Sequence, residues 1–596
     1  MSLFRRGVRR KRLSIVAFAG TLFAYQALAL IGALPAGAAV ATCSFSGGTL
    51  SLAITGDEVF SQDAAGNILV GGAKTDTIAG CNTSAAANLA NTTAVNVTGD
   101  AGNNMLTIDM SDGTDLMDWE DINWTVNLGA DAAAPDDTLR IDGAGVTVAS
   151  DDLEVTFGAT GIDLNDDGDL DVTQSNVETF NVLGGAGDDT VWGAGSTATG
   201  ALFTGDLTAV GNAGDDWFAS GAGTDTFTGG ADEDTIDATG GTSSVTVNLT
   251  AGSLTGGGLG FDTLATIEDI QGSGFGDFLT GDGNDNWIYP GAGDDKIDGE
   301  ALEDTIDYWD AEAAVTVDMD AETATGGSGN DTFSDIEDAS GSDFDDTFVD
   351  DITTDSFYYG AAGDDTFDQG ADPSTGDSDS IDGEGGSDWV DYSQRTEDLT
   401  VTLSSFVGVA GPPATGCGGG AVTAPPCADG DFDTAGETDD VQGVENVSLG
   451  TGDDSFTGNA FGNSVQPGGG QNVLAGLGGS DTLDYLLYEA GVEVNMAGGS
   501  SAGDSATDFE NVVGSDFADT ITGNDGSNTI KSRKGNDNVR AGGGDDTIKA
   551  GGGADSVRAG SGDDDLWGQK GNDYLNGGKG SDFCKGGPGK DTLKSC

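Results

Sequence analysis

Carboxylates supply nearly all of the side-chain chemistry of this chain. Its 596 residues include 103 aspartates and glutamates, 21 lysines and arginines and no histidine, which gives a formal net charge of −82 at pH 7. Without histidine the chain has no Ser-His-Asp or Cys-His nucleophile pair and no HExxH zinc helix. The negative charge argues against nucleic acid or an anionic lipid surface as the main partner, because both are bound through basic surfaces.

The aspartates recur with a period of nine residues. From Gly514 to Lys594 the chain divides into nine consecutive nonapeptides, of which AGGGDDTIK and AGSGDDDLW are typical. The sixth residue is Asp or Asn, the eighth is Ile, Val, Leu or Cys, and the fourth is Gly in every unit except the first. The same frame recurs upstream at 184–192, 211–237, 272–307, 341–349, 360–368, 383–391 and 449–484.

Each nonapeptide has a glycine-rich half and a short β half. Glycines at the first, second and fourth positions permit turns that a side chain would block. The last three residues alternate, so that only the eighth points inward. Two units would form one coil, and successive coils would stack as parallel strands with the aspartates along both edges. No helical period appears outside the leader, so we expect an all-β chain: a parallel β-roll or β-solenoid of glycine- and aspartate-rich nonapeptide repeats, with interrupting β segments.

A longer repeat joins the blocks of nonapeptides. A strand-like segment begins at Val245, Val315, Leu399 and Val492. Each is followed by an acidic segment, and these segments lie around Glu268, Glu337, Glu445 and Glu510. A glycine- and proline-rich insertion at 410–430 interrupts the third interval, and we interpret it as a surface loop.

The first residues have the features of an export signal. Residues 5–12 are basic, residues 13–34 are apolar, and two A-x-A cleavage sequences follow within 36–41. This order predicts a secretory signal peptide. A retained membrane anchor is the alternative, because the apolar run is long. No other stretch has the composition to span a bilayer, so we expect no membrane contact after cleavage.

The cysteines form three local pairs. An even number of cysteines in an exported chain predicts disulfides. Each pair lies alone in its region, which favours Cys43–Cys81, Cys417–Cys427 and Cys584–Cys596 as structural bonds. The last pair would close the end of the roll.

These features divide the chain into five parts. They are a signal peptide at 1–41, an N-terminal β-rich, solenoid-like domain at 42–180, a first repeat block at 181–237, repeat cassettes with strand interludes and the Cys417/Cys427 loop at 238–513, and a C-terminal roll with a terminal cap at 514–596.

The nonapeptide GGxGxDxUx resembles the repeat of RTX (repeats-in-toxin) calcium-binding β-rolls, which are secreted bacterial proteins. In that family the aspartate and glycine carbonyls of a turn bind Ca²⁺ between neighbouring coils. The resemblance implies partners 18 residues apart and several calcium ions as cofactors. It implies the following metal ligands: Asp189, Asp216, Asp225, Asp234, Asp277, Asp295, Asp346, Asp365, Asp388, Asp454, Asp481, Asp519, Asp537, Asp546, Asp555, Asp564, Asp573, Asp582 and Asp591. One edge of the C-terminal roll would hold Asp546, Asp564 and Asp582, and the other Asp537, Asp555, Asp573 and Asp591.

Physical chemistry also favours a metal. A nonapeptide buries a single aliphatic side chain, which offsets little of the entropy lost in ordering nine residues, and carboxylate repulsion adds to the deficit. Calcium would supply coordination and cancel the repulsion. We therefore expect the C-terminal roll to be unfolded without calcium. The alternative, a halophilic surface that merely holds water and salt, requires neither the nine-residue phase nor the preference for Asp over Glu.

Two further motifs are weaker. The segment from Asp163 to Asp171 matches the start of an EF-hand loop, but the twelfth position is Gln174 and no flanking helices are indicated. We favour a calcium-binding turn or a plain hairpin. Gly499–Gly503 fits GxSxG, but no histidine could activate Ser501, so we attribute this match to chance.

Basic residues concentrate at the C-terminal end. Residues 42–530 contain four, and eleven lie in 531–594. Six of these take the ninth position of a unit: Lys531, Arg540, Lys549, Arg558, Lys585 and Lys594. They would form two stripes, one on each side of the roll. They would either neutralise the aspartates or anchor the protein to an acidic cell-wall polymer or polysaccharide.

The sequence thus predicts a secreted, extracellular or cell-surface calcium-binding β-roll with a structural, adhesive or matrix role and no enzymatic activity. The alternative is a polysaccharide-modifying enzyme, or another secreted hydrolase, that carries the repeats as accessory modules. Such an activity would belong to residues 42–180, where an Asp pair could act on neutral sugars. RTX toxins commonly carry an uncleaved C-terminal secretion signal, whereas this chain has an N-terminal leader and ends on its repeats, which argues against a cytotoxin.

Overall fold

The structure is a computed structural model that describes residues 39–46, 49–55, 58–62, 68–70, 94–98, 105–109, 123–128, 138–143, 153–164, 170–175, 177, 179–350, 355–371, 379–403, 440–497 and 504–596. Every regular element in these ranges is a β strand, which confirms the all-β prediction. None of the described residues forms a helix long and apolar enough to cross a membrane. The leader, the Cys417/Cys427 loop and the GxSxG segment lie outside the described residues.

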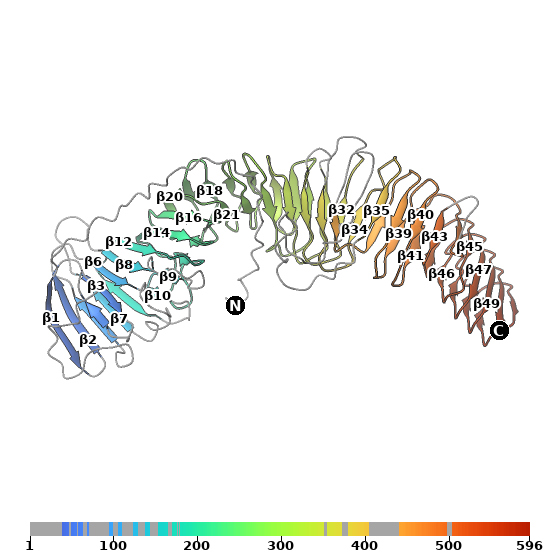
Figure 1. The fold of residues 1–596 in the computed structure, drawn as a ribbon, viewed down its shortest axis with the longest axis horizontal. Coiled ribbons are helices and arrows are strands. Elements are labelled where there is room, and N and C mark those ends of the chain that lie inside the picture. The colour runs from blue at the N-terminus through green and yellow to red at the C-terminus, as the bar shows by residue number, and fades with distance from the viewer. Residues whose placement is uncertain are drawn as a thin grey trace, which may run out of the picture. The chain divides into compact units, whose positions relative to one another are not determined.

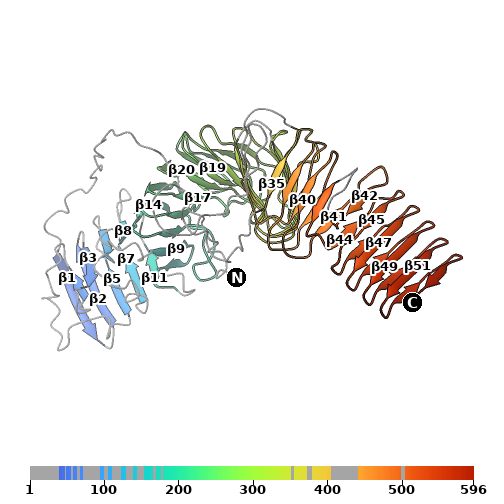
Figure 2. The same ribbon diagram turned by 45° about the vertical axis from the view of Figure 1, so that its right-hand side comes forward.

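The described residues fall into two compact units, which we treat separately. The first unit extends to Tyr308 and includes Ser328–Ile336, and the second contains Trp309–Gly327 and Glu337–Cys596. In both units, strands that are distant in sequence lie side by side in parallel stacks (Figures 1 and 2).

The first unit begins with antiparallel hairpins and continues as parallel stacks. Strand β1 pairs with β2, and β3 with β4, in antiparallel fashion. Two parallel stacks then run through β2–β5–β7–β11 and β3–β6–β8–β12. The bounds are β1 (Ala39–Ser46), β2 (Thr49–Thr55), β3 (Glu58–Gln62), β4 (Ile68–Val70), β5 (Ala94–Thr98), β6 (Met105–Asp109), β7 (Asn123–Asn127), β8 (Thr138–Asp142), β9 (Glu154–Gly158), β10 (Gly161–Asp163), β11 (Val172–Ser175) and β12 (Thr179–Leu183).

The remainder of the first unit contains nonapeptides and one strand interlude. One stack runs β9–β13–β15–β17–β21–β23–β25, and a second runs β12–β14–β16–β20. The interlude strand β18 starts a third, β18–β22–β24–β28. The bounds are β13 (Thr190–Trp192), β14 (Asp206–Ala213), β15 (Trp217–Ala219), β16 (Thr226–Ala231), β17 (Thr235–Asp237), β18 (Val245–Asn248), β19 (Ser253–Gly256), β20 (Gly260–Ala265), β21 (Asp269–Gln271), β22 (Phe278–Thr280), β23 (Trp287–Tyr289), β24 (Lys296–Asp298), β25 (Thr305–Asp307) and β28 (Gly329–Thr332).

In the second unit one sheet is continuous and the facing one is restarted twice. The continuous sheet runs β26–β30–β32–β34–β37–β39–β41–β44–β46–β48–β50–β52. The other side consists of β29–β31–β33–β36, then β35–β38–β40–β43, then β42–β45–β47–β49–β51–β53. Each restart begins with an interlude strand, β35 or β42.

The strands of the second unit are short, and most have three residues. Their bounds are β26 (Val315–Asp318), β27 (Thr323–Gly326), β29 (Asp338–Ser340), β30 (Thr347–Val349), β31 (Phe357–Tyr359), β32 (Thr366–Asp368), β33 (Ser380–Asp382), β34 (Trp389–Asp391), β35 (Thr400–Thr402), β36 (Asp440–Gln442), β37 (Asn446–Ser448), β38 (Ser455–Thr457), β39 (Ser464–Gln466), β40 (Val473–Ala475), β41 (Thr482–Asp484), β42 (Glu493–Asn495), β43 (Ser505–Thr507), β44 (Asn511–Val513), β45 (Thr520–Thr522), β46 (Thr529–Lys531), β47 (Asn538–Gly543), β48 (Thr547–Lys549), β49 (Ser556–Ser561), β50 (Asp565–Trp567), β51 (Tyr574–Lys579), β52 (Phe583–Lys585) and β53 (Thr592–Lys594).

The register follows the predicted coil of two units. Ile530 pairs with Ile548, and Ile548 with Leu566, so neighbouring strands are 18 residues apart. These eighth-position side chains are fully buried and form a narrow core between the two sheets. Cys584 takes the same position in β52 and forms a disulfide with Cys596, which confirms that predicted pair.

The segment that resembles an EF-hand loop is flanked by strands. β10 pairs antiparallel with β11 through Ile162 and Val172. The backbone N–H of Leu164 donates to the carboxylate of Asp171 at 2.8 Å. Residues 165–169 lie outside the described residues. The flanking geometry agrees with a hairpin.

The fourth-position glycines have a steric role. Gly553 has a φ of 154°, and a Cβ there would overlap the carbonyl oxygen of Gly535 in the neighbouring coil. The third-position Gly552 has no heavy atom within 4 Å of its Cβ position. Coils can stack at this distance because the fourth residue has no side chain.

This difference predicts the effects of two neighbouring substitutions. Gly553→Ala must push two coils apart and should destabilise the C-terminal roll by at least ~2 kcal/mol. Gly552→Ala should change its stability by less than ~0.5 kcal/mol. Denaturant unfolding of the full chain in calcium measures both, and equal losses for the two variants would contradict the steric explanation.

Candidate metal sites

The sixth-position aspartates form two buried hydrogen-bonded ladders. On one edge of the C-terminal roll the backbone N–H of Asp537 donates to Oδ1 of Asp555 at 3.0 Å, and that of Asp555 to Asp573 at 3.1 Å. On the other edge Asp546 donates to Asp564 at 2.9 Å. The two predicted edges and the spacing of 18 residues are therefore confirmed.

The second carboxylate oxygen has a partner in some turns. In these closed turns, as we name them, Oδ2 accepts the backbone N–H of the second residue of the same unit. Gly185 donates to Asp189 at 2.6 Å, Ser273 to Asp277 at 2.6 Å, and Ser515 to Asp519 at 2.9 Å. The closed turns are those of Asp189, Asp225, Asp277, Asp346 and Asp519.

In the open turns Oδ2 is buried and has no hydrogen-bond partner. Twelve of the nineteen predicted aspartates are of this kind, and none is more than 2% exposed. The second residue has a positive φ in eleven of the twelve open-turn units. It has an ordinary φ in all five closed-turn units. The open turns are those of Asp216, Asp234, Asp295, Asp365, Asp388, Asp454, Asp481, Asp537, Asp546, Asp555, Asp564 and Asp573.

One asparagine reveals what faces the orphaned oxygen. Asn472 takes the sixth position of unit 467–475, whose second residue Gly468 has a φ of 65°. Its Nδ2 donates to the carbonyl oxygens of Pro467 at 2.7 Å and Gly469 at 3.0 Å. In this turn, whose second residue has a positive φ, two carbonyl oxygens thus face the sixth side chain. We expect the same of the open turns that share this backbone conformation. An aspartate there places a carboxylate oxygen where Asn472 has an N–H donor.

This arrangement fits a cation with oxygen ligands. Carboxylate and backbone carbonyl oxygens are the ligands that Ca²⁺ takes in proteins. Among the described residues, no three acidic or cysteine side chains gather as a metal cluster, so carbonyl oxygens must complete each site. The residues present therefore suit calcium between neighbouring turns, with the open-turn aspartates and the first and third carbonyls as ligands.

Burial without a partner changes the protonation of these groups. It raises the pKa of Asp234 to about 9, of Asp295 to about 8, and of Asp537 and Asp546 to about 7. The cause is loss of hydration, which disfavours the charged form. Near neutral pH such a carboxylate takes up either a proton or a metal ion.

A second ladder, which the sequence analysis missed, runs along the exposed fifth positions. The backbone N–H of Asp563 donates to Oδ1 of Asp545 at 2.8 Å, and that of Ser581 to Asp563 at 2.8 Å. Gln471 donates to Asp453 in the same way at 2.8 Å. The repeated Gly-Asp-Asp sequence was the available signal. Each turn therefore uses its two adjacent acidic residues differently, one inside and one outside.

Glutamates continue the inner ladder at the acidic segments. The backbone N–H of Asp388 donates to Oε2 of Glu445 at 3.1 Å, and that of Asp481 to Glu510 at 2.9 Å. Asp234 donates to Glu268 at 3.1 Å. The longer side chain reaches the ladder from a short corner between two strands, which explains why Glu replaces Asp there.

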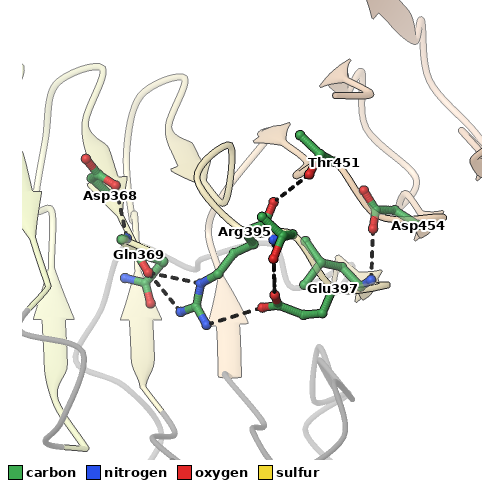
Figure 3. A network of polar contacts seen from close by, with 9 residues as sticks. Asp368, Gln369, Arg395, Glu397, Thr451 and Asp454 are labelled. Carbon is green, nitrogen blue, oxygen red and sulfur yellow. Dashed lines mark hydrogen bonds and ion pairs between the residues drawn. The ribbon is translucent and has the colours of Figure 1, made fainter. Parts of the chain in front are cut away.

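At the third interlude a basic side chain lies inside the coil (Figure 3). Arg395 is 2% exposed, and its Nε and Nη2 donate to the carbonyl oxygen of Gln369 at 3.2 and 2.8 Å. Its Nη1 lies 3.9 Å from Glu397. The interlude has Leu399 at the sixth position, and its N–H donates to Asp454 at 2.9 Å. Where the interlude removes an aspartate, the chain thus supplies its own cation to a carbonyl oxygen of the preceding turn.

The structure places all nineteen predicted aspartates at equivalent positions of turns. Twelve lie in open turns and five in closed turns. The last two, Asp582 and Asp591, accept the N–H groups of Asp564 and Asp573 at the end of the stack. The six ninth-position basic residues are exposed on the outward sides of the strands, away from these turns.

The chain matches the family model of the RTX calcium-binding nonapeptide repeat (4 copies) at residues 181–196, 210–245, 270–306, 448–483, 507–539, 533–566 and 558–593. No curated protein matches the chain. Ten of the twelve open-turn aspartates lie within the matched residues, and Asp365 and Asp388 have the same geometry outside them. Over the matched residues the chain therefore contains RTX-type calcium-binding nonapeptide repeats, and these repeats bind several calcium ions.

Proposed function

We propose that the protein is an exported β-roll with a structural or adhesive role outside the cell, and that its calcium ions occupy the open turns. The orphaned Oδ2 oxygen of each open-turn aspartate is the observation that supports this assignment. The leader-like N-terminus and the Cys584–Cys596 disulfide support export, because disulfides persist in oxidising compartments.

Calcium outside the cell would act as the folding signal. Extracellular calcium modules typically bind with dissociation constants of about 10⁻⁴–10⁻³ M. The chain would remain unfolded at low calcium and would stack its coils after export. The competing interpretation, a polysaccharide-modifying enzyme with accessory repeats, depends on residues 42–180, whose described strands form both antiparallel hairpins and parallel stacks.

Removal of calcium tests this proposal directly. We expect the purified full chain to lose β structure in excess chelator at pH 7.5 and to regain it when millimolar Ca²⁺, but not Mg²⁺, is restored, because uncompensated carboxylates oppose stacking. Circular dichroism and limited proteolysis measure the change. A β spectrum that chelator leaves unchanged would refute calcium-dependent folding.

Asn472 suggests a substitution that separates open from closed turns. Asp564→Asn should let the new amide donate to the carbonyls of Ala559 and Ser561, as Asn472 does in its own turn. We expect fewer bound calcium ions by calorimetry and more residual β structure in chelator than in the unaltered chain.

The matched control is Asp519→Asn in a closed turn. Asn286, Asn463 and Asn528 already take this position in closed turns, and each accepts the N–H of the second residue. Calcium stoichiometry should stay unchanged in this variant. Equal loss of calcium from both variants would show that the two kinds of turn do not differ in metal binding.

The raised pKa values predict opposite pH responses with and without calcium. The folded-state pKa of Asp537 and Asp546 is about 7 against an ordinary 3.8, so the metal-free fold binds protons that the unfolded chain releases. Metal-free stability should therefore fall as the pH rises from about 4 to about 7. Calcium displaces these protons, so the stabilisation by calcium should grow over the same window. Thermal unfolding of metal-free and calcium-loaded protein at pH 5 and 7.5 measures both, and a metal-free protein more stable at pH 7.5 would contradict the assignment.

A further inference from the structure

We propose that the outward side of β46, β48, β50 and β52 binds a linear anionic polysaccharide. The surface consists of Lys531, Lys549, Trp567 and Lys585, which we name the basic ladder, together with Phe583. This inference names a partner for the extracellular role proposed above and rests on the calcium-loaded roll.

The register places the ladder residues in one row. Lys531 pairs with Lys549, Lys549 with Trp567, and Trp567 with Lys585 on consecutive parallel strands. Such strands lie about 4.8 Å apart, so the row presents evenly spaced groups to a chain that runs across the strands. The three lysines are exposed. A linear polymer can therefore meet all of them at once.

The ladder lysines form no ion pair with the described aspartates. Among the described residues, basic side chains form ion pairs in Arg140–Asp142, Arg395–Glu397, and Arg533 and Lys534 with Asp516, and no ladder lysine takes part. Asp565, on the same side of β50, forms no ion pair with them. Lys531 and Lys549 are direct cross-strand neighbours, an arrangement that is unfavourable for like charges. A bound polyanion would remove this repulsion.

Aromatic rings within the row indicate sugars rather than simple anions. The ring centroids of Trp567 and Phe583 lie 5.9 Å apart, and Nζ of Lys549 lies 6.0 Å from the Trp567 centroid. Phe583 is 49% exposed, so its ring is accessible beside Trp567 and Lys585. Rings and cations side by side can hold the apolar faces of sugars and their acidic groups together.

The charge density of the ladder argues against nucleic acid. Three lysines on four strands are sparse compared with duplex DNA, which carries one charge per about 1.7 Å of its axis. A net charge of −82 would repel so dense a polyanion strongly. A polysaccharide with acidic groups on only some of its sugars matches the ladder better.

The other sheet of the C-terminal roll offers a matched control. It carries Arg540, Arg558 and Lys594 in the equivalent ninth positions. Its ring, Tyr574, lies 5.4 Å from the Arg558 guanidinium and 5.3 Å from Lys594, so the roll's own cations already contact it. Removal of these three charges changes the net charge as much as removal of the three ladder lysines.

Binding to hyaluronan, a soluble linear uronate polymer, tests the proposal. The probe is added to the full calcium-loaded chain, with dextran as the neutral polymer and duplex DNA as the alternative polyanion. Of the three polymers, we expect only hyaluronan to bind. The affinity for hyaluronan should fall at least tenfold in K531Q/K549Q/K585Q and in Trp567→Ala. It should fall less than threefold in R540Q/R558Q/K594Q.

Several outcomes would overturn the polysaccharide surface. These are absence of hyaluronan binding, equal loss for both triple variants, stronger binding to DNA, or self-association that the ladder variants abolish while hyaluronan has no effect. Circular dichroism in calcium confirms that each variant is folded. A roll that is folded in chelator and still binds hyaluronan would overturn calcium-dependent folding and leave the surface intact.

Discussion

A single buried oxygen determines how this chain is built. Each sixth-position aspartate uses Oδ1 to join its turn to the neighbouring coil, and Oδ2 must then find a partner inside the protein. The geometry of the coil follows from this requirement. Eighteen residues bring equivalent turns together, one aliphatic residue per unit fills the narrow core, and glycine at the fourth position lets turns approach closely enough to share an ion. At the proposed calcium sites, cations between turns would contribute the stability that a large apolar core supplies in other folds.

The backbone at the second residue decides which partner Oδ2 receives. When that residue has an ordinary φ, its own N–H satisfies the oxygen, as in the turn of Asp519. Among the nineteen predicted aspartates the exception is Asp454, whose Oδ2 has no partner although Gly450 lacks a positive φ. In the Asn472 turn, where φ is positive, carbonyl oxygens face the sixth side chain instead. Glu384, Leu477 and Arg533 adopt positive φ values of 58°, 67° and 72° without being glycine, which costs free energy at each residue. Coordination of an ion explains why this position keeps its strain, because the free energy of coordination would offset the cost of the positive φ.

Much of this architecture could be predicted from the sequence, because it depends on periodicity. The nine-residue phase specified the coil, the two aspartate edges and the inward eighth residue. The Cys584–Cys596 disulfide could be predicted because these two cysteines lie far from the other four in the sequence. The distinction between open and closed turns could not be predicted, because Gly185 and Gly221 stand at the second position of closed turns and are glycines, as in many open ones. The fifth-position ladder and the glutamates of the inner ladder could not be predicted either, because the sequence does not show which neighbouring coil each side chain reaches. The burial of Arg395 could not be predicted, because its turn belongs to an interlude that does not follow the nine-residue repeat.

The interludes limit how far the columns of ions can extend. Each puts an apolar residue, such as Leu399 or Val492, where the repeat has an aspartate, and each starts a new stack on one side while the facing sheet continues. A column of ions at the proposed sites would therefore end at every interlude, and Arg395 contributes a permanent charge at one of these ends. Stacked repeats transmit stability mainly to their neighbours, so a break in the column would divide the roll into blocks that gain and lose calcium separately. The continuous sheet, whose strands remain paired past β35 and β42, would then keep the blocks attached to one another when an individual column is empty.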